Sequence, residues 1–583
     1  MTINVCLLLI LLFSGLVFAD NNSSLNSLFS EEWNYRLKED PLFATNAGNH
    51  QYDDRLPSVT KADQDRRAEY YRGLLKKLNS IDRSTLSKQD QISYDLFKYY
   101  VEDYISFYEF HSYLIPLNAD SGFQTEFAHL PHQLTFASVK DYENYIARLH
   151  AFPTYVQQNI ELMREAIRIG MVLPRAVMNG FEVTMTTHIV DAPEKSVFYP
   201  PFQSFPVGVP ESEHQRLRAE GSKAITDYVI PAYKTLLEFM QKEYLPHTRD
   251  SLAASQLPNG EKYYAFLVRH FTTLPLTPEE LHQTGLREVS RIHKEMEDII
   301  RSVHFEGDFA AFLQFLRTDN RFYAKTPEEL LKDAAYIAKQ MDGKLPSLFK
   351  TLPRTPYGVA PVPDYLAPKY TGGRYVEPPE GSTEPGIYWV NTYALESRPL
   401  YVLESLTFHE AVPGHHLQIS LARELQNLPE FRKFLYIDTF GEGWGLYSEW
   451  LGLEAGFYRD PYSNFGRLTY EMWRACRLVV DTGIHTKGWT RDQAMQYLAS
   501  NTALSLHECQ TETDRYISWP GQALAYKTGE LKIKELRHKA ETALGPKFDV
   551  REFHDAILAN GSVTLPILER MIDDYITSAS SRQ

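Results

Sequence analysis

The sequence predicts a mainly α-helical protein, and three features of the 583-residue chain support this class. Apolar residues recur at three- and four-residue spacing over most of the chain, which is the period of a helix buried on one face. Several segments begin with helix-capping residues, and one short aromatic and β-branched run is typical of a strand. A chain this long exceeds the size at which one hydrophobic core stops growing, so we expect two domains or one large bilobal body.

Three helix starts can be placed from capping residues. The runs beginning at Thr277 and Thr326 each combine a capping threonine, proline at the first helical position and glutamate at the third. Similar reasoning places a helix start at Thr490. The helical pattern covers residues 28–37, 90–112, 140–169, 222–244 and 277–303.

Residues 351–386 interrupt the helical pattern, because 8 Pro and 5 Gly there exclude a regular helix or a central strand. The run 386–391 has the composition of a strand, and we place the edge of a small sheet there. The interruption predicts an N-terminal helical region (20–350), a connection (351–386) and a C-terminal region (387–583). We expect residues 20–583 to form one cooperative unit.

Composition and charge indicate a folded globular protein that does not bind nucleic acid. Apolar residues make up 43% and charged residues 23% of the chain, which excludes a disordered protein. The net charge is −15, and no cluster of Lys or Arg forms the basic face that phosphate binding requires.

The N-terminus resembles a cleaved signal peptide. Residues 1–19 contain no charged side chain, and residues 5–19 form an apolar run that ends in Ala19. This run is shorter than the roughly 20 residues that span a bilayer, so we expect export to the periplasm or medium without stable membrane insertion. Cys6 lies at the start of the run and is not placed as a lipoprotein site. The two remaining cysteines, Cys476 and Cys509, either pair or stay as buried thiols.

A run of histidines and a glutamate in residues 400–420 predicts a metal site. His409-Glu410 resembles the start of the HExxH pattern, in which two imidazoles one helical turn apart bind one zinc ion and the glutamate acts as a base. Pro413 occupies the position of the second histidine, and His415 and His416 follow. On an ideal helix His415 would point about 120° away from His409, and His416 would lie about 10.5 Å along the axis. Neither geometry holds one ion.

The sequence also predicts how this spacing is corrected. Pro413 cannot donate a backbone hydrogen bond, and Gly414 adopts conformations that other residues avoid, so we expect a local bulge. A bulge of two residues brings His415 into the ligand position, and one of three residues brings in His416. We favour His415, with the other histidine as an outer or substrate contact.

The third ligand is predicted to come from residues 439–449. Glu442 is the candidate, and Glu449, which lies about 20° away on the same helix face, is placed where it would support the ligands from outside. Three glycines around Glu442 allow close backbone approach. We therefore expect one Zn²⁺ ion.

Three sequence motifs resemble those of a known protein family. The runs HEAVPGHHLQ, EGWGLYSE and RYISWPGQALAYKTG resemble the bacterial domain of unknown function 885 family, which groups with gluzincin-like metallopeptidases, and the resemblance covers residues 28–575. In related peptidases a glutamate follows HExxH by about two dozen residues and another follows seven later. Glu442 and Glu449 are similar to that pair. The resemblance implies a zincin-like, mostly helical body split by a deep cleft, with a small sheet beside the metal-binding helix.

The remaining predicted site residues follow from the chemistry of peptide hydrolysis. Glu410 is expected to accept the proton of the attacking water, and the oxyanion needs a further hydrogen-bond donor. Tyr516 is favoured because Arg515-Tyr516 resembles an Arg-Tyr pair of the converting-enzyme-like group, although a tyrosine packed in the core is a close alternative. The other candidate donors are Tyr526, Lys527 and His485.

Substrate contacts are predicted on one helix and one strand. The predicted helix at residues 466–485 carries charged residues at three- and four-residue steps, a pattern that is more often a set of ion pairs within the helix. Arg474 or Arg477 on this helix, with His485 just past the helix end, is nevertheless a candidate for binding a peptide carboxylate. Tyr388 to Asn391 is a candidate strand for pairing with substrate backbone. We therefore predict a zinc peptidase acting on short peptides. The alternatives are a zinc hydrolase of another amide or an ester, and a metal-free binding protein.

Overall fold

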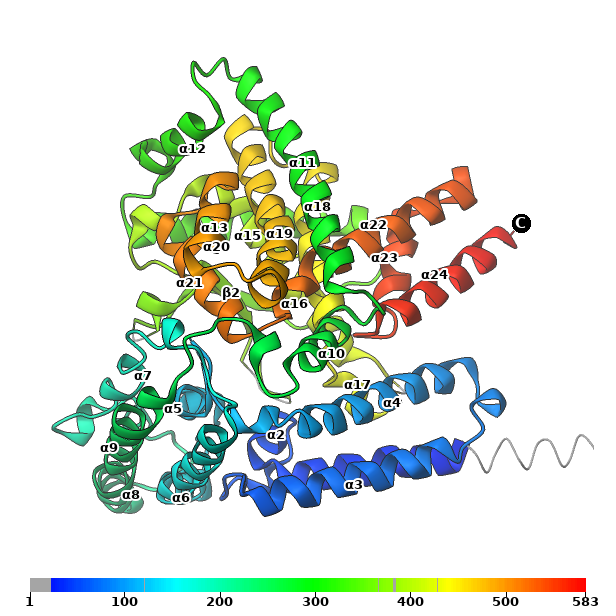
Figure 1. Cartoon of the computed structure of the whole chain (residues 1–583). Coiled ribbons are helices and arrows are strands. Elements are labelled where there is room, and N and C mark those ends of the chain that lie inside the picture. The colour runs from blue at the N-terminus through cyan, green and yellow to red at the C-terminus, as the bar shows by residue number, and fades with distance from the viewer. Residues whose placement is uncertain (1–21, 120, 365, 381–383, 427, 583) are drawn as a thin grey trace, which may run out of the picture.

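Helices account for most of the molecule, and one small sheet lies among them (Figure 1). The computed structural model describes residues 22–582 apart from 120, 365, 381–383 and 427. The predicted signal peptide and Cys6 lie outside the described residues. The mainly helical class is confirmed. The bilobal division around a deep cleft and the region boundaries at 350 and 387 stay predictions.

The N-terminal half of the chain is a series of helices that begins with a helical segment at residues 22–39. Helices α3 and α4 run side by side along one end of the molecule (Figure 1). The helices of this half are α2 (Pro41–Asn46), α3 (Lys61–Asn79), α4 (Lys88–Glu109), α5 (Phe123–Gln133), α6 (Val139–Ile169), α7 (Val183–Thr186), α8 (Glu211–Ala224), α9 (Ile230–Phe239), α10 (Gly260–Thr272), α11 (Pro278–Ser302), α12 (Phe309–Thr318), α13 (Pro327–Asp342) and α14 (Leu345–Leu348).

The C-terminal half contains the sheet and the helices that carry the predicted site. Its strands are β1 (Tyr357–Pro361), β2 (Gly373–Val376) and β3 (Gly386–Val390). Its helices are α15 (Leu403–Glu410), α16 (His415–Glu424), α17 (Glu430–Lys433), α18 (Asp438–Glu454), α19 (Pro461–Lys487), α20 (Arg491–Asn501), α21 (Leu506–Ser518), α22 (Ala525–Leu544), α23 (Val550–Leu558) and α24 (Leu565–Ser580).

The predicted helix starts are confirmed. Thr277 and Thr490 cap α11 and α20 in reciprocal capping boxes, and Thr326 accepts a hydrogen bond from the third residue of α13. Each cap satisfies a backbone N–H that has no partner inside its own helix. The pattern at 222–244 also forms one helical stretch, which includes π-helical turns at Ile225–Val229 and Met240–Tyr244.

The sheet differs from the prediction in its order. Strand β3 forms where the composition predicts it, but the prediction that it is a sheet edge is wrong. It pairs in parallel with β1 and in antiparallel with β2, so the order is β1-β3-β2. Both edge strands come from the Pro/Gly-rich stretch, which agrees with the expectation that this stretch forms no central strand.

The helix predicted across residues 400–420 is broken in two. Helix α15 ends at Glu410, residues 411–414 form a turn, and α16 restarts at His415. A Cβ atom at Gly414 would lie 1.9 Å from the backbone oxygen of His409, so only glycine fits this turn. The break changes the direction of the chain between α15, which carries His409, and α16, which carries His415 and His416. A continuous helix would keep these side chains pointing apart or far along the axis.

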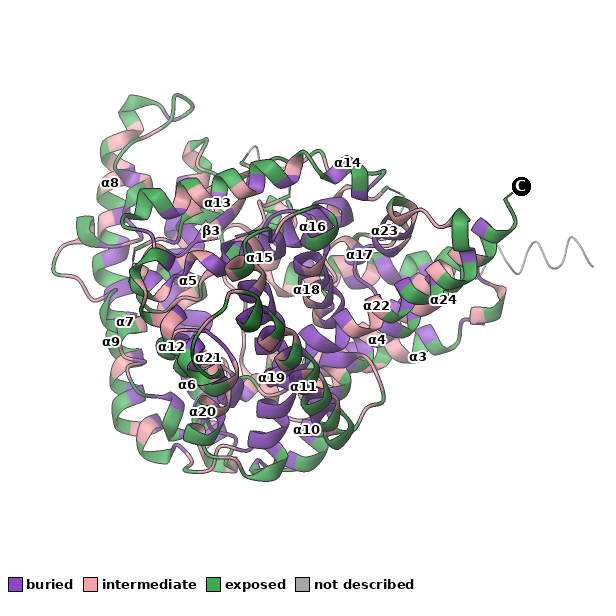
Figure 2. Cartoon of the chain, turned by 90° about the horizontal axis from the view of Figure 1, so that it is seen from above, coloured by how far each residue is buried: buried purple, intermediate pink, exposed green. Residues whose placement is uncertain are grey.

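Two hydrophobic cores hold the molecule together, and each combines distant parts of the chain. One joins residues 114–334 with 388–524, and the other joins 25–101 with segments between 341 and 572. Helix α19 is buried at every residue from 465 to 485 and lies in the buried centre of the molecule (Figure 2). Because neither core belongs to one half of the sequence, the two halves depend on each other for burial.

The contact between α18 and α22 brings the backbones of the two helices together. A Cβ atom at Gly443 would lie 2.5 Å from Cα of Gly529, and one at Gly529 would lie 1.9 Å from the backbone oxygen of Thr439. Two glycines therefore permit this crossing, which fixes the position of the neighbouring Glu442.

The two cysteines of the described chain are free. Cys476 and Cys509 are both buried, and burial raises the pKa of each thiol well above its ordinary value, so neither is a reactive thiolate. Among the described residues, no helix combines the length and apolar character needed to cross a bilayer.

Candidate metal centre

A cavity of about 560 Å³ lies where α15, α16, α18, α19 and strand β2 meet. Its wall includes His409 and Glu410 from α15, His415 from α16 and Glu442 from α18. These residues belong to three helices, and the turn at 411–414 and the glycine-lined crossing of α18 determine how they meet.

Two imidazoles and one carboxylate converge in this cavity. Nε2 of His409 lies 3.3 Å and Nε2 of His415 lies 3.4 Å from the same oxygen of Glu442. One ligand atom from each of the three residues lies within 4.8 Å of the others. Ligand atoms at about 2.1 Å from a tetrahedral zinc ion lie roughly 3.4 Å apart, which matches the two separations at Glu442.

Glu449, which the sequence predicts to support the ligands from outside, contacts His409. Oε1 of Glu449 lies 2.8 Å from Nδ1 of His409, and Arg474 lies 3.1 Å from the same carboxylate oxygen. This arrangement directs Nε2 of His409 toward Glu442, as outer hydrogen-bond partners of metal-binding histidines commonly do.

The charges of the centre depend on one another. Burial alone would lower the pKa of His409, but its hydrogen bonds with Glu442 and Glu449 outweigh burial and raise that pKa to about 10. Burial likewise opposes the charge on Glu442, yet the two histidines hold its pKa well below the ordinary value. His409 and Glu442 therefore stabilise each other's charged forms. A cation bound between them would take the place of the proton on His409.

Helix α18 can approach His409 because it has glycine at the contact. A Cβ atom at Gly445 would lie 2.6 to 2.9 Å from three atoms of the His409 ring. A side chain at this position would therefore push the imidazole away from Glu442 and Glu449.

We expect Gly445→Ala to weaken zinc binding about 10–100-fold, the range found when an orienting partner of a metal-binding histidine is lost. A zinc titration with a competing chelator measures this change. Gly452→Ala is the matched control, because a Cβ atom there would lie 2.5 Å from Tyr458 and 2.7 Å from Phe408, away from the cavity. The control should lower the melting temperature without changing zinc affinity. Equal zinc affinity in both variants would contradict the prediction.

Glu410 is held at the edge of the cavity by strand β2. Its Oε2 accepts a hydrogen bond of 2.8 Å from the backbone N–H of Tyr375, and the residue is 9% exposed. The carboxylate therefore has a fixed orientation beside the imidazoles, which is the arrangement that a general base requires.

The structure separates the two adjacent histidines. His415 lies with His409 and Glu442, whereas Nδ1 of His416 lies 3.1 Å from the hydroxyl of Tyr375 and 3.3 Å from that of Ser420. Burial lowers the pKa of His416 to about 4. Of the two alternatives left open by the sequence, the structure brings His415 and not His416 into the group.

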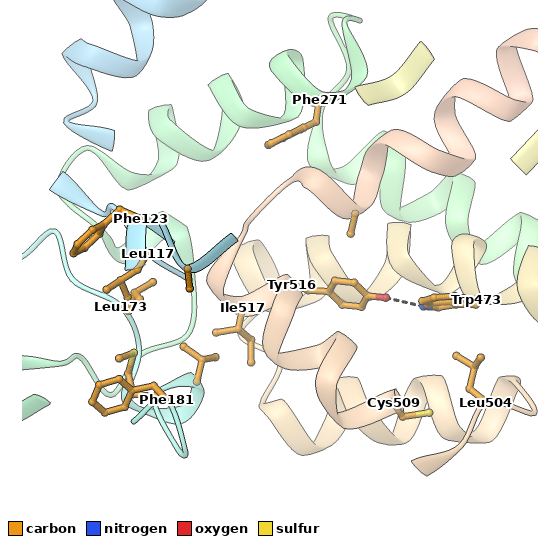
Figure 3. Close-up of a cluster of buried hydrophobic side chains, with 14 of the residues drawn as sticks. Leu117, Phe123, Leu173, Phe181, Phe271, Trp473, Leu504, Cys509, Tyr516 and Ile517 are labelled. Atoms are coloured by element: carbon orange, nitrogen blue, oxygen red, sulfur yellow. Dashed lines mark hydrogen bonds between the residues drawn. The ribbon is translucent and has the colours of Figure 1, made fainter. Parts of the chain in front are cut away.

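Tyr516 and His485 lie outside the cavity. The Tyr516 hydroxyl accepts hydrogen bonds from Trp473 and Arg477 inside a hydrophobic cluster, as Figure 3 shows for Trp473. Both ring nitrogens of His485 contact backbone groups, those of Ala254 and Tyr516, and burial lowers its pKa to about 3. Neither side chain is placed to contact a substrate, because each is fully engaged in the core.

Of the other residues predicted to contact substrate, some lie in the core and some line the cavity. Lys527 is fully buried and pairs with Glu288, Glu471 and Glu530. The amide of Asn391 donates to three backbone carbonyls of residues 367–371.

Tyr388 is buried beside Thr407 in the central strand, so it cannot pair with an added strand. By contrast, Tyr526, Arg474 and Arg477 do line the cavity.

Three cavity residues were missed by the sequence reasoning. Arg515 and Tyr375 line the wall, and Tyr436 lies just before α18 with its hydroxyl against Gly441. Tyr436 is 43% exposed, yet burial, and after it the carboxylate of Glu442, raises its pKa well above the ordinary value. It lines the cavity on the side of Glu442. Only its position six residues before Glu442 was a signal, which is weak among 37 tyrosines.

The fold and the site define a largely helical protein in which two imidazoles and two carboxylates are grouped in one cavity. The chain belongs to the family described as bacterial protein of unknown function (DUF885), whose model matches residues 41–572. No curated protein matches it.

Two solved structures are similar over nearly the whole chain. One is a candidate lipoprotein from Colwellia psychrerythraea, with 28% identity, a TM-score of 0.88, and coverage of 96% of this chain and 99% of that chain. The other is a candidate lipoprotein of unknown function from Shewanella oneidensis, with 18% identity, a TM-score of 0.66, and coverage of 94% and 98%. The second likeness concerns the fold alone.

Proposed function

We propose that this protein is an exported zinc-dependent peptidase of the gluzincin-like group. The observation that carries the proposal is the convergence of His409, His415 and Glu442, with Glu410 beside them, in one cavity. Two histidines and a carboxylate with an open fourth position form the ligand set of catalytic zinc in several peptidases. Zinc bound there would lower the pKa of a coordinated water and polarise a carbonyl group.

The remaining roles belong to residues of the chain itself. Glu410, oriented by the Tyr375 N–H, accepts a proton from the attacking water and returns it to the departing amine. Tyr526 and Tyr436 are two of the tyrosines that line the cavity, and they replace Tyr516 as candidate donors to the oxyanion.

The shape of the cavity supports short peptides as substrates. A volume of about 560 Å³ is within the range of ligand sites and excludes a folded protein. Residues 373–375 of the edge strand β2 line the cavity, so β2 takes the place of β3 as the candidate strand for pairing with substrate backbone.

Export is part of the same proposal. It is supported by the mostly apolar, uncharged run at residues 5–19 and by the description of the similar structure from Colwellia psychrerythraea as a candidate lipoprotein.

The direct test is hydrolysis of a mixed library of short peptides, followed by mass spectrometry. The zinc-loaded protein is expected to cleave peptide bonds, a strong chelator to abolish cleavage, and stoichiometric zinc to restore it. Cleavage that is unaffected by removal of all bound metal would contradict the zinc mechanism. Cleavage of amide or ester model substrates with no cleavage of any peptide would replace the peptidase by the other hydrolase.

A further inference from the structure

Two arginines on one wall of the cavity share a carboxylate. Arg477 lies 2.7 Å from one oxygen of Glu512, and Arg515 lies 3.5 Å from the other. Both arginines line the cavity, and so does Arg474 on the same helix as Arg477. These guanidinium groups lie near three buried carboxylates, those of Glu449, Glu508 and Glu512, and Glu449 also contacts His409 of the metal centre. Capacity for a further anion therefore depends on which guanidinium donors are unused.

The hydrogen bonds of the arginines show which of them has capacity for that anion. Arg474 is held by Glu449 and by the backbone oxygen of Tyr470, and its buried Nε has no hydrogen-bond partner among the described residues. Arg477 donates through Nε and Nη2, but its buried Nη1 has no hydrogen-bond partner in the part of the chain that the structure describes. A buried N–H without an acceptor is costly, and a carboxylate from a bound molecule would remove that cost.

Arg515 is the more accessible member of the pair. Its side chain is 12% exposed, compared with 2% for Arg477. It donates to Gln522 and to the hydroxyl of Tyr526, both of which also line the cavity. Arg515 therefore contacts the cavity directly, with Arg477 behind it.

Tyr526 fixes the distance of this wall from the metal centre. Its ring centroid lies 4.0 Å from the guanidinium carbon of Arg477 and 6.4 Å from the His409 ring. These two steps together are no longer than roughly three residues of extended chain at about 3.5 Å per residue.

We propose that Arg477 and Arg515 bind a carboxylate of the peptide substrate, roughly one to three residues from the bond that is cleaved. This inference rests on the proposed peptidase function, because it places the carboxylate relative to a scissile bond. A peptide supplies such a group as its C-terminus or as an acidic side chain. In the first case the enzyme removes short fragments from the C-terminal ends of peptides.

The test measures binding separately from turnover. Four tetrapeptides, with a free or amidated C-terminus and with Glu or Gln at the third position, are titrated into the metal-free full-length protein by calorimetry. The peptide that carries the recognised carboxylate is expected to bind about 10–100-fold more tightly than its uncharged counterpart, as for a charge-assisted hydrogen bond. The pair that differs identifies the source of the carboxylate, and equal affinity for all four overturns the inference.

Arg515→Gln should remove this difference in affinity. Arg491→Gln is the matched control, because Arg491 pairs with Asp514, the neighbour of Arg515, and is not part of the cavity wall. The control should keep the difference, and a preference that persists in Arg515→Gln overturns the inference.

Hydrolysis of the same peptides by the zinc-loaded protein separates the two proposals. If binding discriminates the peptides but none is cleaved, the carboxylate site stands and the peptidase function fails. If peptides are cleaved but binding shows no preference, the peptidase function stands and the carboxylate site fails.

Discussion

Replacing Glu410 by Gln is expected to lower kcat for peptide hydrolysis about 10²–10⁴-fold, the usual contribution of a positioned general base, while zinc content stays unchanged. The amide of glutamine has nearly the shape of the carboxylate, and its oxygen can still accept the hydrogen bond from the Tyr375 N–H. It cannot accept a proton at neutral pH. Steady-state kinetics on one library-derived peptide and metal analysis of the same preparation measure the two quantities.

The control for this variant is Glu404→Gln on the same helix. Glu404 accepts a hydrogen bond from the backbone N–H of Tyr458 and does not line the cavity. Its replacement should leave kcat within about twofold, since substitutions away from a catalytic group rarely change the barrier. If Glu410→Gln turned over peptide at the wild-type rate with zinc bound, another group would have to be the base.

Local sequence signals predicted the helix starts, and they named His409, His415 and Glu442, which the structure brings together. A capping box involves residues only three apart, so the starts of α11 and α20 could be predicted without knowledge of the fold. The break after Glu410 follows from Pro413 and Gly414 for the same local reason. The sequence favoured His415 over His416 but left both open, because the size of the break depends on how α16 packs, and the structure groups His415 with His409 and Glu442.

The residues that the sequence wrongly assigned to the site lie on helices and strands that are buried on all sides. Helix α19 is buried from 465 to 485, so the period of its polar residues does not distinguish the face toward the cavity from the face toward the core. His485 therefore looked like a site residue but lies in the core. Likewise, the composition of β3 predicts a strand, but its two partners are set by the path of the Pro/Gly-rich stretch. Family resemblance placed Tyr516 by its neighbour Arg515, and of the two only Arg515 faces the cavity.

Replacing Glu442 by Ala is expected to weaken zinc binding by more than about 100-fold, because it removes a ligand and not an orienting partner. Among the carboxylates of the described residues, Glu442 pairs with both imidazoles, at 3.3 and 3.4 Å, and no other carboxylate there takes its place. Glu449→Gln should weaken binding less, about 10–100-fold, since Glu449 pairs with Nδ1 of His409 and not with the nitrogen that faces Glu442. Competition titrations with a zinc chelator measure both affinities.

The order of these effects distinguishes a metal site from a set of buried ion pairs. Glu454→Ala, on the same helix, removes a carboxylate that pairs with Arg537 and should leave zinc affinity unchanged. If the three residues formed only a hydrogen-bonded cluster, the wild type would bind zinc no more tightly than the Glu442→Ala variant. In that case the loss of Glu442 would appear only as a lower stability, since it would leave two buried imidazoles without their shared acceptor. A graded loss of affinity, largest at Glu442 and absent at Glu454, is what coordination by His409, His415 and Glu442 requires.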